Sequence, residues 1–321
     1  MANILREINH VNAKSLDEAV EFLSKDGSQP IAGGTDLLGT MKLYILRDYP
    51  QTIVNLKTIT PSLDYITVSD AGVLRIGALT KLRDIAKSDI VAKRWTALSQ
   101  AAGRTASPHI REMGTIGGNI CQLNRCLYFR KKWNRFDCLR KGGDTCYAIT
   151  GENRYHSIFG AVKACVAVNP SDLAPALMAL NATIITTKRS IKIGGFWDVG
   201  IPGSTVLATD ELVREISIPA PADGVKSAFV KFALRSSIDF PIVNCAAMIG
   251  GDDASICLNA VHNNPYKATR AEEALKGKSI DDVLAEVAGD ASVQAAMPLA
   301  LNEWKIQIAK TMVKRVVLAC K

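Results

Sequence analysis

The amino-acid sequence predicts an α+β fold, in which helices and strands follow one another without a regular βαβ alternation. Of its 321 residues, 48% are hydrophobic and 22% are charged, which is ordinary for a globular protein and excludes disorder and collagen-like repeats. The length suits two domains of about 100–200 residues each. The proline-containing segment 219–221 follows a predicted strand and is the candidate boundary between them.

Helix and strand signals alternate irregularly along the first 120 residues. Ser15 and Glu18 form a capping box, so we expect a helix to begin directly after Ser15. Alternating and continuous apolar runs predict a short buried strand at 52–56 and a hairpin at 64–68 and 73–79. Two helices are expected over 80–87, with Thr80 as its cap, and over 91–105.

Regular patterns resume after residue 163. A strand is expected at 164–168, and Ser171 then caps a predicted helix over 172–180. Further strands are expected at 183–187, 190–193, 212–218, 227–234, 242–249 and 255–261, and helices near 267–275, 280–287 and 303–319.

Charge and hydropathy narrow the class of protein. Lys and Arg number 39 against 31 Asp and Glu, which gives a net charge of +8. No apolar run approaches the roughly 18 residues that cross a bilayer, and the first ten residues lack the apolar core of a signal peptide. We therefore expect a cytoplasmic protein with no membrane partner.

The excess charge gathers in residues 121–154, where eight bases and three acids give +5. The same stretch holds Cys121, Cys126, Cys138 and Cys146, half of the eight cysteines. Without an export signal, such cysteines point to a metal site rather than to disulfides. Four thiolates gathered by loops hold an iron–sulfur cube or a structural zinc, and the lack of C-x2-C pairs favours the cube.

Buried free thiols are the remaining interpretation of these cysteines. Cys245, Cys257 and Cys320 lie in apolar strand or helix contexts, so we expect them in the core.

Two glycine turns suit a phosphate-containing ligand. Gly33-Gly34-Thr35 follows a strand end and precedes a helix, a geometry that turns backbone amides toward one point. Gly117-Gly118-Asn119 offers a second such turn. Neither forms a G-x-G-x-x-G fingerprint and each alone is more often a plain tight turn, but the pair makes a dinucleotide site more credible.

Two polar groups have ordinary explanations from the sequence alone. Helix capping accounts for Ser171 and Asp172, although their place shortly after Cys165 leaves room for a ligand role. Lys231 and Arg235 stand four apart near a strand end, where such residues are usually solvated charges.

Three motifs in series resemble a known family. They are Ala32-Gly-Gly-Thr-Asp-Leu37, Thr115-Ile-Gly-Gly-Asn119 and Ser171-Asp-Leu-Ala-Pro-Ala-Leu177. In this order they resemble the FAD-binding medium subunit of the xanthine oxidase family of molybdenum hydroxylases, over essentially the whole chain.

The resemblance implies the two-lobed FAD-binding fold of the vanillyl-alcohol oxidase type at 1–222, with lobes at about 1–56 and 57–222. A C-terminal α+β domain at 223–321, a small antiparallel sheet with helices, would follow.

The resemblance also implies how FAD is held between the lobes. The first glycine turn would bind the pyrophosphate and the second would line the opposite side. Asp172 and Lys231 would approach the flavin or its ribityl and adenosine portions. The full set of implied FAD-binding residues is Ile31, Ala32, Gly33, Gly34, Thr35, Asp36, Leu37, Thr105, Thr115, Gly117, Gly118, Asn119, Asp172 and Lys231.

A cysteine-containing insertion at about 121–165 separates the second and third motifs. It resembles the [4Fe-4S]-carrying insertion of the 4-hydroxybenzoyl-CoA reductase β subunit and of the periplasmic aldehyde oxidoreductase flavin subunit. The reductase-like spacing places its fourth ligand at Tyr155, so Cys165 follows the aldehyde-oxidoreductase-like placement and Cys121 is its competitor. The implied cluster ligands are Cys126, Cys138, Cys146 and Cys165.

The resemblance implies an oxidoreductase subunit that transfers electrons and has no catalytic residue for the organic substrate. Its partners would be a large subunit with the molybdenum cofactor and a small [2Fe-2S] subunit. A 4-hydroxybenzoyl-CoA reductase-like role is expected first, with ferredoxin as the donor docking near Arg130, Lys131 and Lys132. The alternative is an aldehyde or N-heterocycle oxidoreductase that passes electrons outward. A remote third interpretation, a zinc-stapled nucleic-acid-binding module, predicts zinc and no flavin.

Overall fold

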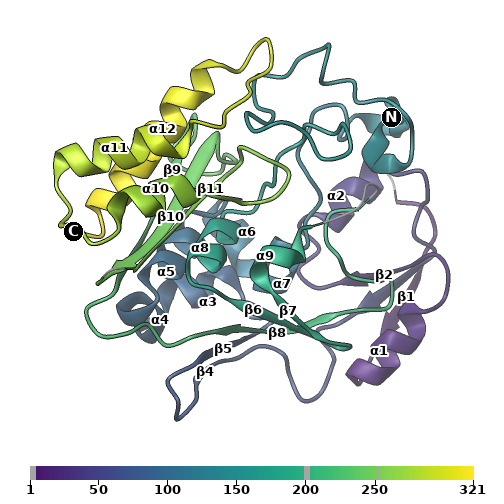
Figure 1. Ribbon diagram of the computed structural model, residues 1–321. Helices are drawn as coiled ribbons and strands as arrows, with labels where there is room; N and C mark the ends of the chain where they lie inside the picture. The colour runs from purple at the N-terminus through teal and green to yellow at the C-terminus, as the bar shows by residue number, and fades with distance from the viewer. Residues whose placement is uncertain (1–4, 199–202, 252) are drawn as a thin grey trace.

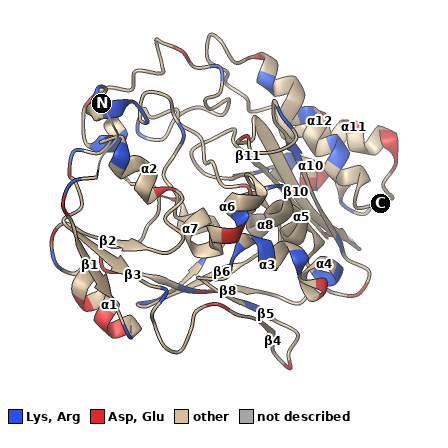
Figure 2. Ribbon diagram, turned by 180° about the vertical axis from the view of Figure 1, so that it is seen from behind, with Lys and Arg blue, Asp and Glu red and all other residues tan. Residues whose placement is uncertain are grey.

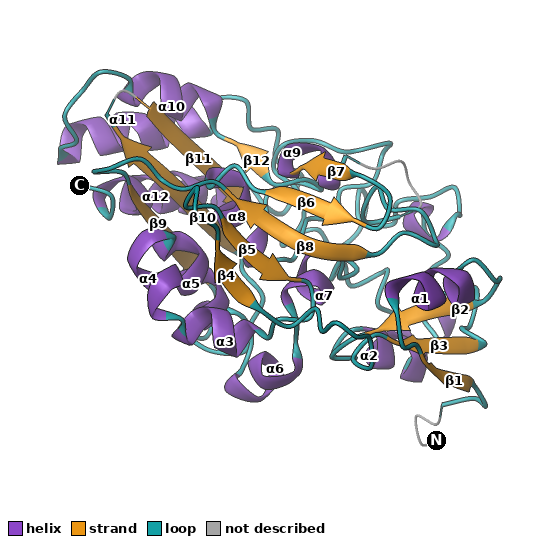
Figure 3. Ribbon diagram, turned by 90° about the horizontal axis from the view of Figure 1, so that it is seen from below, coloured by secondary structure: helices purple, strands orange, loops and turns teal. Residues whose placement is uncertain are grey.

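The architecture is built from three sheets, each made by a different stretch of the chain (Figures 1 and 3). The computed structural model describes residues 5–198, 203–251 and 253–321. Helices pack on each sheet without a βαβ repeat, so the predicted α+β class is confirmed. Within the described ranges, no helix combines the length and the apolar character that a bilayer crossing needs.

The first sheet is parallel and occupies the N-terminal part of the chain. Its strands run in the order β1-β3-β2. The capping box is confirmed, because the Ser15 hydroxyl oxygen accepts a hydrogen bond from the Glu18 amide at 3.1 Å. The elements of this part are β1 (Asn9–Asn12), α1 (Leu16–Leu23), β2 (Ser28–Ile31), α2 (Leu37–Lys42) and β3 (Thr52–Asn55).

The second sheet is antiparallel and has five strands in the order β4-β5-β8-β6-β7. The strands are β4 (Ile66–Val68), β5 (Leu74–Gly77), β6 (Thr183–Thr186), β7 (Ser190–Lys192) and β8 (Val213–Ile218). The helices of this part are α3 (Leu82–Lys87), α4 (Asp89–Arg94), α5 (Thr96–Arg104), α6 (Pro108–Met113), α7 (Ile116–Ile120), α8 (Leu173–Ala179) and α9 (Ile193–Phe196).

The third sheet is antiparallel, with strands in the order β12-β11-β10-β9. Helix α12 packs on β9 and β10, while α5 and α8 of the preceding part also contact this sheet (Figure 1). The elements are β9 (Lys226–Phe232), β10 (Val243–Gly250), β11 (Asp253–Asn259), β12 (Tyr266–Lys267), α10 (Thr269–Leu275), α11 (Asp282–Ser292) and α12 (Trp304–Leu318).

Two expected helix features differ in the structure. The single helix expected at 91–105 is two helices, α4 and α5, separated at Trp95, which has φ −123° and ψ 50°. The Trp95 indole donates a hydrogen bond to the Pro219 carbonyl at 2.9 Å, a contact distant in sequence. Thr80 does not cap α3, because its hydroxyl donates to the Tyr65 carbonyl at 2.9 Å.

Two predictions near the cysteines also differ. The glycine-containing segment 114–120 includes a short helix, α7, in place of a plain turn. The strand expected at 164–168 is not formed, and only an isolated bridge pairs Val162 with Cys165.

The cysteine-containing insertion is mostly loop, with two single 3-10 turns at Lys132–Asn134 and Leu139–Lys141. A small apolar cluster of Ile45, Phe129 and Cys138 anchors it to the segment that follows α2. At its far end the Ile158 amide donates to the Val261 carbonyl at 2.9 Å. The insertion is therefore fixed both to the N-terminal part and to the part that carries the third sheet.

Candidate functional site

One cavity of about 730 Å³ collects the three sequence motifs. Its volume lies in the range of about 300–1,000 Å³ that is usual for small-molecule and cofactor sites. The residues predicted to bind FAD all line it except Lys231: Ile31, Ala32, Gly33, Gly34, Thr35, Asp36, Leu37, Thr105, Thr115, Gly117, Gly118, Asn119 and Asp172.

The first glycine turn presents free amides to this cavity. Among the described residues, none accepts a hydrogen bond from the amides of Gly33, Gly34 or Thr35. Gly34 has φ +70°, a conformation that favours glycine, and a Cβ on Gly33 would overlap the carbonyl oxygen of Met113. The turn thus needs glycine for its own geometry and still leaves donors for an anion.

The second glycine turn behaves differently from the sequence expectation. Its amides are used inside the protein: Gly117 donates to the Ala78 carbonyl at 2.9 Å, and Gly118 donates to the Thr115 hydroxyl at 3.1 Å. Asn119 accepts a hydrogen bond from the Ser171 hydroxyl, which joins the second and third motifs. This turn shapes the wall of the cavity rather than offering free donors.

Asp172 lines the cavity and belongs to a buried network of polar side chains. Its carboxylate accepts from Lys231 Nζ at 2.7 Å and from Asn244 Nδ2 at 2.8 Å. Burial raises the pKa of Asp172, and the positive charge of Lys231 opposes that rise. The expectation that Lys231 is a solvated charge is wrong, since its side chain is buried, whereas the Arg235 side chain is 71% exposed and pairs with Asp239.

Two further residues of the wall were not among those predicted to bind FAD. Arg125 and Phe240 both line the cavity, and the guanidinium carbon lies 4.5 Å from the centre of the Phe240 ring. Burial lowers the pKa of Arg125 to about 10, which still leaves it charged at neutral pH. In the sequence, Arg125 stands directly before a candidate ligand, Cys126, and Phe240 lies in the segment Asp239-Phe-Pro241.

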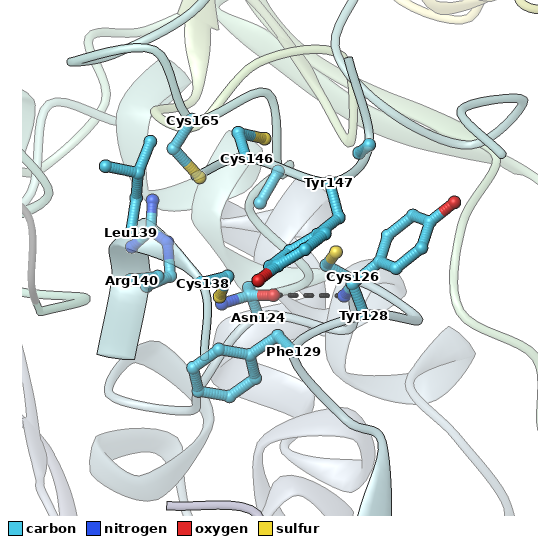
Figure 4. A pocket seen from close by; sticks show the side chains of 12 residues that line it. Asn124, Cys126, Tyr128, Phe129, Cys138, Leu139, Arg140, Cys146, Tyr147 and Cys165 are labelled. Atoms are coloured by element: carbon cyan, nitrogen blue, oxygen red, sulfur yellow. Dashed lines mark hydrogen bonds between the residues drawn. The ribbon is translucent and has the colours of Figure 1, made fainter. Parts of the chain in front are cut away.

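A second, much smaller cavity lies inside the insertion (Figure 4). The four cysteines predicted as cluster ligands line it: Cys126, Cys138, Cys146 and Cys165. Cys121, the competitor for the fourth position, lines the large cavity instead. The loops place these four thiols along one cavity, but its space of about 20 Å³ suits about one water.

The charges around these thiols differ from one cysteine to the next. A hydrogen bond from Cys146 and the positive charge of Arg140 lower the pKa of Cys165, despite its burial. Burial raises the pKa of Cys126 to about 11. The surroundings of Cys165 therefore favour the thiolate, the form that binds metals.

His156 is an additional neighbour of the small cavity. Its Nε2 lies 3.2 Å from the sulfur of Cys126. Burial, together with the nearby Lys305, lowers the pKa of His156 to about 4, so the imidazole is neutral. Among the residues that the structure describes, no three His, Cys, Asp or Glu side chains are grouped to hold a single metal ion.

The basic surface expected over the insertion is smaller than its composition suggests. Arg125 and Arg130 are half-buried, and Arg140 and Lys141 are buried. The exposed bases are Lys131, Lys132, Arg135 and Arg154. Figure 2 shows blue segments on α3, α4 and α12 as well as on the loops near the N-terminus, so the positive charge is spread over the molecule.

Comparison with known proteins decides between the interpretations. Residues 6–221 match the family described as the FAD binding domain in molybdopterin dehydrogenase. Residues 228–320 match the CO dehydrogenase flavoprotein C-terminal domain. The chain is a FAD-binding medium subunit of the xanthine oxidase family of molybdenum hydroxylases. The medium subunit is thus a flavoprotein and part of an oxidoreductase, which favours the flavin interpretation over the zinc module.

Individual relatives agree with this assignment. The medium subunit is 34% identical over 295 residues to the aldehyde oxidoreductase FAD-binding subunit PaoB of Escherichia coli, and the match covers 88% of both chains. It is 29% identical to the glyceraldehyde dehydrogenase medium chain of Sulfolobus acidocaldarius, over 91% of this chain and 89% of that one.

A solved structure confirms the fold. Carbon monoxide dehydrogenase of Hydrogenophaga pseudoflava superposes with a TM-score of 0.76 at 25% identity, and the match covers 99% of this chain and 98% of that one. The FAD-binding fold with a C-terminal domain that carries an antiparallel sheet is therefore as the resemblance implied.

Proposed function

We propose that the medium subunit holds both FAD and a [4Fe-4S] cluster and transfers electrons within a molybdenum enzyme that oxidises an aldehyde. The observation that carries the proposal is the position of the cysteines. Four of them line one small cavity, while Cys121 lines the large one. The 34% identity to an aldehyde oxidoreductase FAD-binding subunit supports the aldehyde as substrate class.

The large cavity would hold FAD. The free amides of Gly33, Gly34 and Thr35 would bind the diphosphate, and Asp172, held in place by Lys231, would orient the rest of the cofactor. The described part of the chain offers this cavity the polar groups that a dinucleotide needs, so the residues fit the cofactor.

The small cavity would hold the cluster through Cys126, Cys138, Cys146 and Cys165. The present space, about 20 Å³, is smaller than a cube, so cluster binding would require the loops that carry these four residues to move apart. Bound FAD would supply the conversion between two-electron and one-electron chemistry, and the cluster would pass single electrons.

We also propose the division into an FAD-binding domain at 1–222 and a C-terminal domain at 223–321. The family matches at 6–221 and 228–320 support it. The partners would be a large subunit with the molybdenum cofactor and a small iron–sulfur subunit. The names of the relatives, which call them medium chains or FAD-binding subunits, support such a complex.

Cysteine substitution tests the cluster ligands. Replacing Cys126, Cys138, Cys146 or Cys165 by Ser one at a time should remove most of the iron from anaerobically purified protein. Cys121→Ala and Cys320→Ala are matched controls and should retain it. Full iron in Cys165→Ser together with loss of iron in Cys121→Ala would contradict the proposed ligand set.

A second candidate keeps both cofactors but reverses the flow of electrons. In a 4-hydroxybenzoyl-CoA reductase-like enzyme, an acidic donor such as ferredoxin would dock at the insertion, where Lys131, Lys132 and Arg135 are exposed. Arg130 no longer belongs to this surface, because it is half-buried and pairs with Asp36. Neutralising Lys131 and Lys132 should then slow reduction by ferredoxin at low salt, and an unchanged rate would reject this docking.

A further inference from the structure

The carboxylate of Asp36 lies where its negative charge should repel the diphosphate of bound FAD. Asp36 follows the first glycine turn directly, lines the large cavity and has a side chain that is 20% exposed. A diphosphate bound by the amides of that turn would be close to this negative charge, and like charges in a partly buried site disfavour binding.

The cysteine-containing insertion supplies two positive charges at this point. Arg125 Nη1 lies 3.0 Å and Arg130 Nη1 lies 2.8 Å from Oδ1 of Asp36. The backbone amide of Leu123 donates to Oδ2 at 2.9 Å. One carboxylate therefore faces two guanidinium groups. The three side chains together carry a charge of +1, whereas Asp36 alone would carry −1.

The two arginines differ in how many of their N–H groups have partners in the protein. Arg130 is fully engaged in the protein, because it also donates to the carbonyls of Asn124 at 2.8 Å and Leu123 at 2.9 Å. Arg125 lines the cavity and donates from Nη2 to Gln122 Oε1 at 2.9 Å. Its Nε is buried and has no hydrogen-bond partner among the described residues.

A buried N–H without an acceptor is costly, and a guanidinium is well suited to phosphate oxygens. Arg125 lies at the wall of the cavity, with its guanidinium carbon 4.5 Å from the centre of the Phe240 ring. Arg125 also contacts Asp36, the residue next to the glycine turn, so a phosphate acceptor for this guanidinium is expected at the end of the cavity where that turn lies.

We propose that Arg125 binds the diphosphate of FAD, and that Arg125 and Arg130 together neutralise Asp36 so that this diphosphate is accepted. The inference rests on the proposed placement of FAD in the large cavity. It makes flavin affinity depend on the insertion that carries the cysteines, since both arginines come from it.

The test compares two flavins. The full-length subunit, freed of flavin, is titrated with FAD and with riboflavin, which lacks the phosphates, by fluorescence quenching. Arg125→Gln should weaken FAD binding about 10- to 100-fold and leave riboflavin binding unchanged. Arg154→Gln, an exposed arginine of the same insertion, is the matched control and should change neither. Arg125→Lys should lose less affinity for FAD, because it keeps the charge.

A double variant tests whether the negative charge of Asp36 opposes FAD binding. Asp36→Asn added to Arg125→Gln should recover part of the lost FAD affinity, because it removes a negative charge that Arg130 alone then balances. Equal FAD affinity in Arg125→Gln and Arg154→Gln would overturn the inference, and so would a parallel loss of riboflavin binding. Iron content of the unaltered subunit is measured alongside: its absence would reject the proposed cluster and leave this inference standing.

Discussion

Lys231 Nζ lies 2.7 Å from Oδ2 of Asp172, and the two side chains are only 4% and 3% exposed. Asp172 belongs to the third flavin motif, whereas Lys231 lies on β9 of the third sheet. The pair therefore connects the wall of the flavin cavity to the C-terminal part of the chain. Lys231 also donates to the carbonyl of Arg104 at 3.1 Å, which ties the end of α5 to the same point.

Lys231→Met should destabilise the subunit by about 3–5 kcal/mol, because it leaves a buried carboxylate without its partner charge. Adding Asp172→Asn should recover part of this loss, since the uncompensated charge is removed. Urea unfolding of the three proteins measures both effects. Lys276→Met, at an exposed lysine, is the control and should stay within about 0.5 kcal/mol of the unaltered protein.

Gly33→Ala should abolish most FAD binding, because the new Cβ would overlap the Met113 carbonyl and push the turn out of place. We expect the affinity to fall by at least about tenfold, which equals a loss of about 1.4 kcal/mol of binding free energy. Gly39→Ala is the control. Gly39 lies on α2, and no atom is within 4 Å of a carbon added there. It should keep FAD and slightly stabilise the helix; FAD loss in both variants would reject the explanation.

His156 should set the potential of the proposed cluster through its hydrogen bond to Cys126, 3.2 Å away. A thiolate only accepts, so the neutral imidazole must donate from Nε2. Losing this bond in His156→Leu should lower the midpoint potential by about 40 mV, the equivalent of about 1 kcal/mol for one electron. A redox titration followed by EPR measures the shift.

His156→Gln tests whether the donor or the ring matters. The Gln amide retains a donor, so its potential should lie nearer to that of the unaltered protein. His10→Leu, at an exposed histidine of β1, is the control and should cause no shift. A potential that is unchanged in His156→Leu would show that the contact does not tune the cluster.

Lys305 should make the stability of the fold depend on pH. Its side chain is buried on α12, and the ammonium donates to the His156 carbonyl at 3.0 Å and to the Ala260 carbonyl. Burial lowers the pKa of Lys305 from 10.5 to about 7. Between these two values the unfolded chain binds more protons than the folded one, so stability should rise with pH from about 7 to 10.5.

Urea unfolding at several pH values checks this. The slope that Lys305 contributes is at most about 1.4 kcal/mol per pH unit, and below pH 7 its contribution should be constant. In Lys305→Met that part of the slope should vanish, whatever the other groups contribute. An identical slope in both proteins would mean that Lys305 stays charged in the fold.

The sequence was sufficient for most of the fold because its signals there are local. The capping box at Ser15 and the hairpin of β4 and β5 depend on residues close in sequence, and both form as predicted. The break at Trp95 was not predictable, because the indole bonds to Pro219, 124 residues away. The missing strand at 164–168 has the right apolar pattern, but the segment forms one isolated bridge, at Cys165, and no continuous ladder.

The parts of the candidate site that consist of sequence motifs were predictable. The parts that depend on contacts between segments distant in sequence were not. All predicted FAD-binding residues except Lys231 line the cavity, and Lys231 itself was expected from its own sequence context to be solvated. Its burial follows from the packing of β9 beside Asp172. Arg125 and His156 belong to none of the three flavin motifs, and their contacts with Asp36 and Cys126 span 89 and 30 residues of sequence.

The central claim is that one chain carries FAD and an iron–sulfur cluster side by side. The most direct measurement is the metal and flavin content of anaerobically purified subunit, with EPR after reduction by dithionite. The account predicts about four irons and one FAD per chain, with the signal of a reduced [4Fe-4S] cluster. FAD with zinc, or with no metal, would contradict the cluster and leave the cysteine-containing insertion as a structural element of a flavin subunit.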